Sequence, residues 1–196
     1  MVRGLGSGME NKSLIVDSQN SVLVIVDVQE RLAAAMPKGV CERVVEQITT
    51  LLIAASTLDV PVVVTEQYPK GLGNTVIELK SKLPSETKTI EKTSFSSNRT
   101  ADFTLAVENS GKQQVILVGM ETHICVLQTA LDLQEQGYQV FVVEDAVSSR
   151  SKSNQYNALQ RLRNAGVIIT NLESMIFEWL GDSQHPEFKT LAQLIV

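Results

Sequence analysis

Three side chains capable of acid–base and nucleophilic chemistry each lie near the end of a strand-like run. Asp27 follows "SVLVIV", Lys92 lies in "TIEKTSF", and Cys125 comes a short turn after "QQVILVG". A thiolate nucleophile needs a base that accepts its proton and a cation that stabilises its charge. Asp27 suits the first role and Lys92 the second, so the three residues together indicate covalent catalysis by a cysteine.

Each of these residues alone has a more ordinary interpretation. A carboxylate at a strand end often caps a neighbouring loop, a lysine is usually solvated, and an isolated cysteine is usually a small buried hydrophobe. Cys125 is expected in the first turn of a helix, where free N–H groups and the helix dipole lower the pKa of a thiol. Only the convergence of all three side chains on one pocket favours the catalytic interpretation.

The elements that must position these residues alternate between strand and helix. Parallel βαβ units with right-handed crossovers follow from such alternation. We therefore expect one three-layer, Rossmann-like α/β/α domain with a six-stranded parallel sheet of order 3-2-1-4-5-6, in which the first and fourth strands meet at the ligand-binding crevice. Strands are predicted at 21–29, 60–67, 87–95, 113–119, 138–145 and 167–171, and helices at 40–58, 100–110, 123–136, 153–165, 173–180 and 187–195.

Two further segments are expected near that crevice. The backbone between Gly119 and Cys125 must turn tightly from strand to helix, and its N–H groups suit a developing oxyanion. A long polar connection, "YPKGLGNTVIELKSKLPSE", follows the second strand, and loops of this length are often functional. Gln67 and Tyr68 follow the second strand and Phe95 follows Lys92, so these three are candidate substrate-binding residues, with simple packing as the alternative for each.

Composition restricts the partners and the compartment. The formal net charge is -5 and the basic residues are scattered, which argues against nucleic acid, and no apolar run approaches the roughly 20 residues that span a bilayer. The first residues have no apolar secretory core, and two cysteines do not make a disulfide framework, so we expect a cytoplasmic protein. Residues 1–18 are predicted to be a flexible leader and residues 19–196 a single domain.

These motifs resemble those of the isochorismatase-like hydrolase superfamily, in its cysteine hydrolase type. The resemblance spans roughly residues 20–180 and rests on "VLVIVDVQ", "EKTSFS" and "VILVGMETHICVLQTALDLQEQGYQVFVVEDAVSSR". It implies Asp27, Lys92 and Cys125 as catalytic residues and a cis peptide at Met120–Glu121. It also implies an oxyanion hole formed by the backbone N–H groups of Glu121 and Cys125.

Two differences from known branches refine the resemblance. The nicotinamidase branch carries an Asp-x-His-x-x-His metal site after the second strand, where this chain reads "TEQYPKGLG" without histidine, so no metal and no cofactor is expected. The isochorismate-cleaving enzymes lack the cysteine that this chain keeps. The chain therefore resembles the branch of isochorismatase domain-containing proteins, which implies a homo-oligomer acting on a small molecule.

The leading hypothesis is a metal-independent cysteine hydrolase that cleaves a small amide-like C–N bond through a thioester. The alternative is a catalytically inactive, oligomeric interaction protein on the same scaffold. A phospho-receiver ranks last because Lys92 stands where a phosphorylatable aspartate is needed. A dinucleotide fold is disfavoured because no G-x-G-x-x-G follows the first strand.

Overall fold

A six-stranded sheet forms the centre of the computed structural model, which describes residues 13–195. Every pair of neighbouring strands is parallel, and the order is β3-β2-β1-β4-β5-β6. This confirms the predicted α/β/α fold class and strand order. The strands are β1 (Ser21–Val26), β2 (Val62–Gln67), β3 (Thr89–Lys92), β4 (Gln114–Met120), β5 (Gln139–Ser148) and β6 (Ile168–Thr170).

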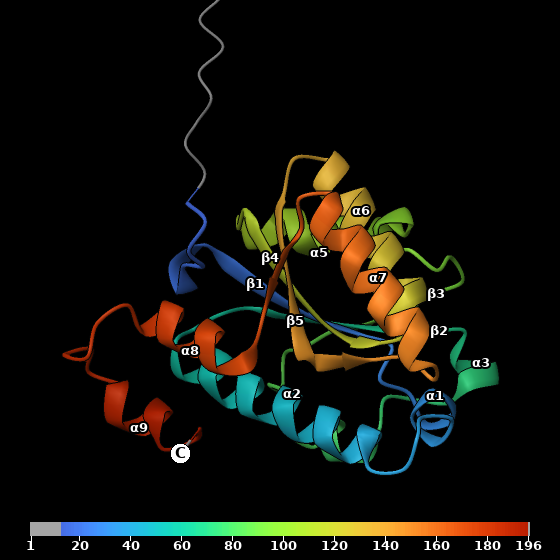
Figure 1. Cartoon of the computed structure of the whole chain (residues 1–196), viewed down its shortest axis with the longest axis horizontal. Helices are drawn as coiled ribbons and strands as arrows, with labels where there is room; N and C mark the ends of the chain where they lie inside the picture. The colour runs from blue at the N-terminus through green and yellow to red at the C-terminus, as the bar shows by residue number, and fades with distance from the viewer. Residues whose placement is uncertain (1–12, 196) are drawn as a thin grey trace, which may run out of the picture.

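Helices cover both faces of the sheet and enclose two hydrophobic cores (Figure 1). One face carries α2 (Val40–Thr57), α8 (Leu172–Leu180) and α9 (Phe188–Ala192), and the other carries α5 (Ala101–Ser110), α6 (Leu127–Glu135) and α7 (Lys152–Asn164). Because both faces are covered, β1 and β4 are buried along their whole length, as their apolar sequences predict.

The long connection after β2 contains two short helices, α3 (Pro69–Leu72) and α4 (Ile77–Lys80). It is attached to the segment that follows β1: Thr75 forms an isolated bridge with Gln29, and Val76 N–H donates to the Val28 carbonyl over 3.0 Å. Helix α1 (Glu30–Ala34) packs beside α3 at this end of the sheet (Figure 1). The sequence did not reveal these helices, because four or five residues are too few to show a helical period.

The structure differs from the predicted extent of the leader and from the predicted start of one helix. Val16, assigned to the flexible leader, is 1% exposed and its N–H donates to the Glu178 carboxylate of α8 over 2.8 Å; Ser18 is also buried. Residues 1–12 of that leader lie outside the described residues. The helix predicted at 123–136 begins instead as a single π-helical turn, η3 (Thr122–Val126), and continues as α6.

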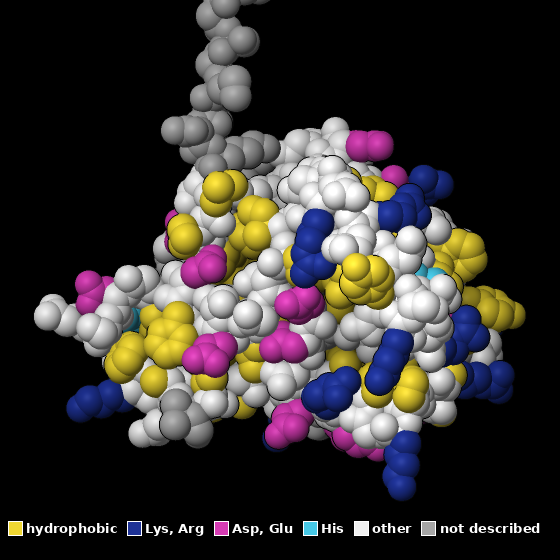
Figure 2. Space-filling view, in the orientation of Figure 1, with side chains coloured by type: hydrophobic (Ala, Val, Ile, Leu, Met, Phe, Trp, Pro, Cys, Tyr) yellow, Lys and Arg dark blue, Asp and Glu magenta, His cyan; other side chains and the backbone are white. Residues whose placement is uncertain are grey.

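The surface carries no continuous basic patch on the face shown in Figure 2, where lysine and arginine side chains stand separately among other groups. Hydrophobic side chains gather on that face near α8 and α9, where the rings of Phe177 and Phe188 lie 6.2 Å apart. Within residues 13–195, no helix is long and apolar enough to cross a membrane.

Candidate active site

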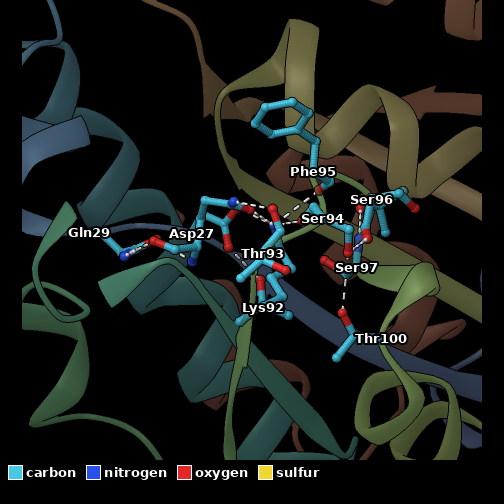
Figure 3. Close-up of polar contacts among 12 residues, drawn as sticks. Asp27, Gln29, Lys92, Thr93, Ser94, Phe95, Ser96, Ser97 and Thr100 are labelled. Atoms are coloured by element: carbon cyan, nitrogen blue, oxygen red, sulfur yellow. Dashed lines mark hydrogen bonds and ion pairs between the residues drawn. The ribbon is translucent and has the colours of Figure 1, made fainter. Parts of the chain in front are cut away.

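The fold brings the Lys92 ammonium to the Asp27 carboxylate. Asp27 is the first residue after β1, and Lys92 is the last residue of β3; their Nζ and Oδ2 atoms lie 2.8 Å apart. Both side chains are fully buried. Strand β2 lies between β1 and β3, so the lysine side chain reaches across it (Figure 3).

Strand β2 supplies further partners for this ion pair, and the sequence analysis missed their role. Thr65 donates its hydroxyl to the other oxygen of Asp27, Oδ1, over 2.8 Å. Gln67 accepts from Lys92 Nζ through its Oε1 atom over 2.7 Å. Residues 65 and 67 share one face of β2 because side chains alternate along a strand, so a search for polar residues at this period would have found Thr65.

Gln67 was predicted to bind substrate, but its side chain is 8% exposed and engaged with the protein. Its Nε2 atom donates to the Thr93 carbonyl over 2.7 Å. The side chain of Gln29, fully buried, pairs with the Gln67 backbone: its Oε1 accepts from the Gln67 N–H over 2.7 Å, and its Nε2 donates to the Gln67 carbonyl over 2.9 Å.

Tyr68 and Phe95 stand at the surface beside the ion pair. Their exposed fractions are 55% and 53%, and the Phe95 ring points away from the Asp27–Lys92 pair (Figure 3). The Tyr68 N–H donates to the Lys92 carbonyl over 2.8 Å. A cavity of about 600 Å³ lies here, lined by Tyr68, Pro69, Lys70, Glu91, Lys92, Thr93, Ser94, Arg99 and Thr100. A larger cavity of about 860 Å³ lies apart from the ion pair, against α5 and the edge of the sheet.

Cys125 lies in η3, immediately after β4, and is 4% exposed. Burial raises the pKa of its thiol above the ordinary value, the nearby Asp27 carboxylate raises it further, and the Lys92 ammonium partly offsets both effects. The prediction that the start of a helix lowers the pKa of the Cys125 thiol is therefore wrong for this structure. Desolvation and the neighbouring negative charge both disfavour the ionised form of the thiol.

The turn between β4 and η3 is held by hydrogen bonds to the Glu121 carbonyl and by Arg150, which follows β5. The peptide bond between Met120 and Glu121 is cis. The Glu121 carbonyl accepts from the N–H groups of Ile124 and Val126, over 3.1 and 3.2 Å. The buried Glu121 carboxylate pairs with Arg150, which donates from its backbone N–H and from Nε over 3.0 to 3.1 Å. The sequence analysis left this side chain without a role.

The other reactive side chains lie outside this cluster. His123 Nδ1 lies 2.9 Å from the Ser149 hydroxyl, and Cys41 begins α2 as a half-buried free thiol. Among residues 13–195 no group of three or more His, Cys, Asp or Glu side chains is arranged to hold a metal ion.

The fold and the position of this polar cluster define a doubly wound α/β scaffold with its candidate site at the carboxyl ends of the strands. Residues 21–174 match the isochorismatase domain, and the chain belongs to the isochorismatase family. It is 38% identical over 183 residues to isochorismatase domain-containing protein 2 of Xenopus laevis, covering 91% of this chain and 84% of the relative.

Two solved structures extend the comparison. The structure of Mar1 ribonuclease from Caenorhabditis elegans is 41% identical, covers 92% of both chains and has a TM-score of 0.86. YcaC from Pseudomonas aeruginosa, solved with hexane-2,5-diol and covalent acrylamide, is 26% identical, covers 92% of this chain and 96% of its own, and has a TM-score of 0.80. Family membership supports a hydrolase function for this chain.

Proposed function

We propose that this protein is a metal-independent cysteine hydrolase that cleaves a small amide-like C–N bond, with Asp27, Lys92 and Cys125 as its catalytic residues. The observation that carries the proposal is the fully buried ion pair between Asp27 and Lys92, with Cys125 near enough that both charges affect its thiol pKa. A carboxylate, an ammonium and a thiol in one buried cluster match the requirements of a nucleophilic cysteine.

The first half-reaction transfers the acyl group to sulfur. The thiol of the resting enzyme is protonated, so Asp27 accepts its proton as the Cys125 sulfur forms a bond to the substrate carbonyl carbon. The Lys92 ammonium stabilises negative charge on both the Asp27 carboxylate and the Cys125 sulfur during the proton transfer. The tetrahedral intermediate collapses when the C–N bond breaks, Asp27 returns the proton to the leaving nitrogen, and a thioester remains.

The second half-reaction consumes one water molecule. Asp27 accepts a proton from the water molecule while the water oxygen forms a bond to the thioester carbon. The C–S bond then breaks, the sulfur takes the proton from Asp27, and the carboxylic acid is released. Asp27 and Cys125 return to their starting states, so the cycle needs no oxidant, reductant or cofactor.

The backbone N–H groups of Glu121 and Cys125 are proposed to stabilise the oxyanion in both half-reactions. The N–H groups of Ile124 and Val126, on either side of Cys125, are directed at the Glu121 carbonyl. The Glu121–Arg150 ion pair holds the same turn against the end of β5. These contacts hold the backbone that carries the N–H groups of Glu121 and Cys125. Hydrogen-bond donors fixed in place before the reaction contribute strongly to acyl transfer.

The position of the second-strand loop supports a metal-independent reaction. Where the metal-binding branch has Asp-x-His-x-x-His, this chain reads "TEQYPKGLG", a stretch that includes Gln67 and contains no histidine. The amide of Gln67 is a poor substitute for a carboxylate ligand and is already hydrogen-bonded to Lys92.

A direct test uses two probes of Cys125. A panel of small amides, ureas and carbamoyl compounds is scored for ammonia release, and we expect turnover to vanish in Cys125→Ala. Acrylamide, which is covalently bound in the Pseudomonas aeruginosa relative, is expected to add one adduct mass to the wild-type chain and none to Cys125→Ala.

Cys41→Ala is the matched control, because Cys41 is the chain's other cysteine and lies in α2. This variant should keep both the turnover and the adduct. Turnover retained by Cys125→Ala would contradict the catalytic role, as would an adduct that depends on Cys41.

One observation favours the rival function, a catalytically inactive interaction protein on the same scaffold. Neither of the two cavities described above is lined by Cys125 or Asp27. The rival predicts that the wild-type chain turns over no amide in the panel, so that Cys125→Ala changes nothing. A ribonuclease activity, the name given to the Caenorhabditis elegans protein, has no support from the net charge of -5.

The proposed enzyme is a cytoplasmic homo-oligomer with a small-molecule substrate, and acts on neither nucleic acid nor membrane. Exposed hydrophobic side chains near α8 and α9 support self-association. Light scattering should therefore give a mass well above the 21.5 kDa of one chain, and a monomer at micromolar concentration would contradict this part of the proposal.

A further inference from the structure

We propose that Gln67 is a positioning residue, which fixes the Lys92 ammonium and through it the Asp27 carboxylate. This inference rests on the proposed function, because it concerns the same ion pair. It assigns Gln67 to the catalytic framework rather than to substrate recognition, and it includes Gln29 as the residue that holds Gln67. We call the side chains of Gln29 and Gln67 the amide clamp.

The Lys92 ammonium has more acceptors than protons. Its three N–H groups face four oxygen atoms: Gln67 Oε1 at 2.7 Å, Asp27 Oδ2 at 2.8 Å, the Phe95 carbonyl at 3.0 Å and the Ser94 carbonyl at 3.2 Å. A substrate can bond to this ammonium only by displacing one of them. Lys92 therefore acts on the other catalytic groups rather than on the substrate directly.

Only two of these acceptors come from outside the loop that follows Lys92. The carbonyls of Ser94 and Phe95 lie two and three residues further along the chain, so their positions depend on that loop. Asp27 and Gln67 come from the end of β1 and the end of β2, within the sheet. Gln67 is thus the one neutral side chain that anchors the ammonium to the sheet beside its charged partner.

The orientation of the Gln67 amide is fixed by its two neighbours. An ammonium donates only, so the amide oxygen must face Lys92, and the NH₂ group faces the Thr93 carbonyl at 2.7 Å. The opposite orientation would place NH₂ against ammonium and oxygen against carbonyl. The hydrogen-bond pattern therefore needs an amide at this position.

Gln29 completes a closed circuit of contacts. Its side chain bonds both the N–H and the carbonyl of Gln67, and also donates to the Gly73 carbonyl at 2.7 Å. Gln29 follows Asp27 by two residues, so the circuit runs from Asp27 through Gln29, Gln67 and Lys92 back to Asp27. All four side chains are at most 8% exposed, and a fully satisfied buried network is rigid.

The test observes the Lys92 ammonium itself by ¹H–¹⁵N NMR of lysine side chains in the full chain, with the signal assigned through Lys92→Met. We expect a persistent NH₃⁺ signal in the wild type, because burial and hydrogen bonding slow its proton exchange. Gln67→Met keeps the length of the side chain and removes the acceptor, so the signal should be lost by rapid exchange. Gln67→Glu loses the donor to the Thr93 carbonyl but keeps the acceptor that faces Lys92, so it should retain the signal.

Gln114→Met is the matched control. Gln114 is 3% exposed, makes three side-chain hydrogen bonds, and lies at the opposite, amino-terminal end of β4. It should lower stability and leave the Lys92 signal unchanged. Three results would overturn the proposal. They are a Lys92 signal that persists in Gln67→Met, a signal that is absent from the wild type, and a signal that is lost equally in Gln114→Met.

A second readout separates positioning from simple stability. The pH profile of Cys125 alkylation by iodoacetamide should move to higher pH in Gln67→Met, because a misplaced Lys92 no longer offsets the charge of Asp27, and should not move in Gln114→Met. Among residues 13–195, the titratable groups that interact with the Lys92 ammonium are Asp27 and Cys125. Neither readout needs a substrate, so failure of the clamp is distinguishable from failure of the hydrolase proposal, which is decided by turnover in Cys125→Ala.

Discussion

Gly119 lies opposite Val26 in the pairing of β4 with β1, and the two backbones are too close for any side chain. A Cβ atom added at Gly119 would approach the Val26 carbonyl oxygen to 2.0 Å, and the φ angle of Gly119 is 119°, which L-residues rarely adopt. Val26 immediately precedes Asp27. The close approach therefore brings the acid of β1 beside the turn that carries the cysteine.

The substitution Gly119→Ala should accordingly lower the free energy of unfolding by about 3 kcal/mol or more, measured from denaturant midpoints. Gly111→Ala is the control, since Gly111 also has a positive φ of 68° but has no atom within 4 Å of an added Cβ. It should cost about 1–2 kcal/mol from backbone strain alone. Equal costs would show that the approach to Val26 carries no penalty.

Removing Lys92 should destabilise the protein by leaving a buried carboxylate unpaired. We expect Lys92→Met to cost about 3–5 kcal/mol. The double variant Asp27→Asn, Lys92→Met should cost less than the sum of the two single changes, because no isolated charge remains. A double-mutant cycle from unfolding curves gives this coupling, and strict additivity would contradict a direct interaction.

The reactivity of Cys125 should follow the direction of its pKa. Because burial and Asp27 raise the pKa of this thiol, alkylation by iodoacetamide should be slow at neutral pH and should rise only at alkaline pH. Asp27→Asn removes one raising influence and keeps Lys92, so it should label faster at neutral pH while losing turnover. Slower labelling of Asp27→Asn would contradict the assigned electrostatics.

The same raised pKa predicts a loss of stability at alkaline pH. In the unfolded chain the thiol ionises near its reference pKa of about 8.5, whereas in the folded chain it stays protonated to higher pH. The contribution of the thiol to stability is therefore fully present below the unfolded pKa of about 8.5 and is lost as the pH rises from there towards the folded pKa. Unfolding curves of Cys125→Ala should show a weaker decline with pH than those of the wild type, and parallel declines would refute the assignment.

The ion pair between Glu121 and Arg150 should contribute more to the free energy of unfolding than an exposed ion pair does. The Glu121 side chain is 4% exposed, so Arg150→Met would leave a buried carboxylate with one fewer partner and should cost about 1–3 kcal/mol. Arg163→Met breaks the pair with Glu144, whose side chain is 43% exposed, and should cost about 0–1 kcal/mol. Comparable costs would argue against a structural role for Glu121 in the turn.

The sequence was sufficient for the sheet and for grouping Asp27 with Lys92, whose side chains are in contact. Apolar runs such as 113–119 are long enough to identify as strands, and the alternation with helices determines a parallel order. Asp27 and Lys92 could be grouped because the carboxyl ends of parallel strands share one edge. Their direct contact across β2 depends on the length of the lysine side chain, which no pattern of spacing reveals.

Other parts of the site depend on tertiary context. Gln67 and Gln29 are polar residues at strand ends, and nothing in their local sequence distinguishes an amide that binds substrate from one that binds Lys92. The pKa of Cys125 was predicted in the wrong direction because burial and the distance to Asp27 are properties of the fold. Val16 was assigned to the leader because its packing partner, α8, lies more than 150 residues away.

The complete burial of the Asp27–Lys92 pair also determines how the protein responds to dissolved ions. Salt weakens exposed pairs because mobile counter-ions gather around each charge within a Debye length of about 8–10 Å. No counter-ion can approach two charges that have no contact with solvent. The electrostatic arrangement around the cysteine should therefore be the same in dilute buffer and in concentrated brine, whereas exposed pairs such as Arg163–Glu144 weaken as the ionic strength rises.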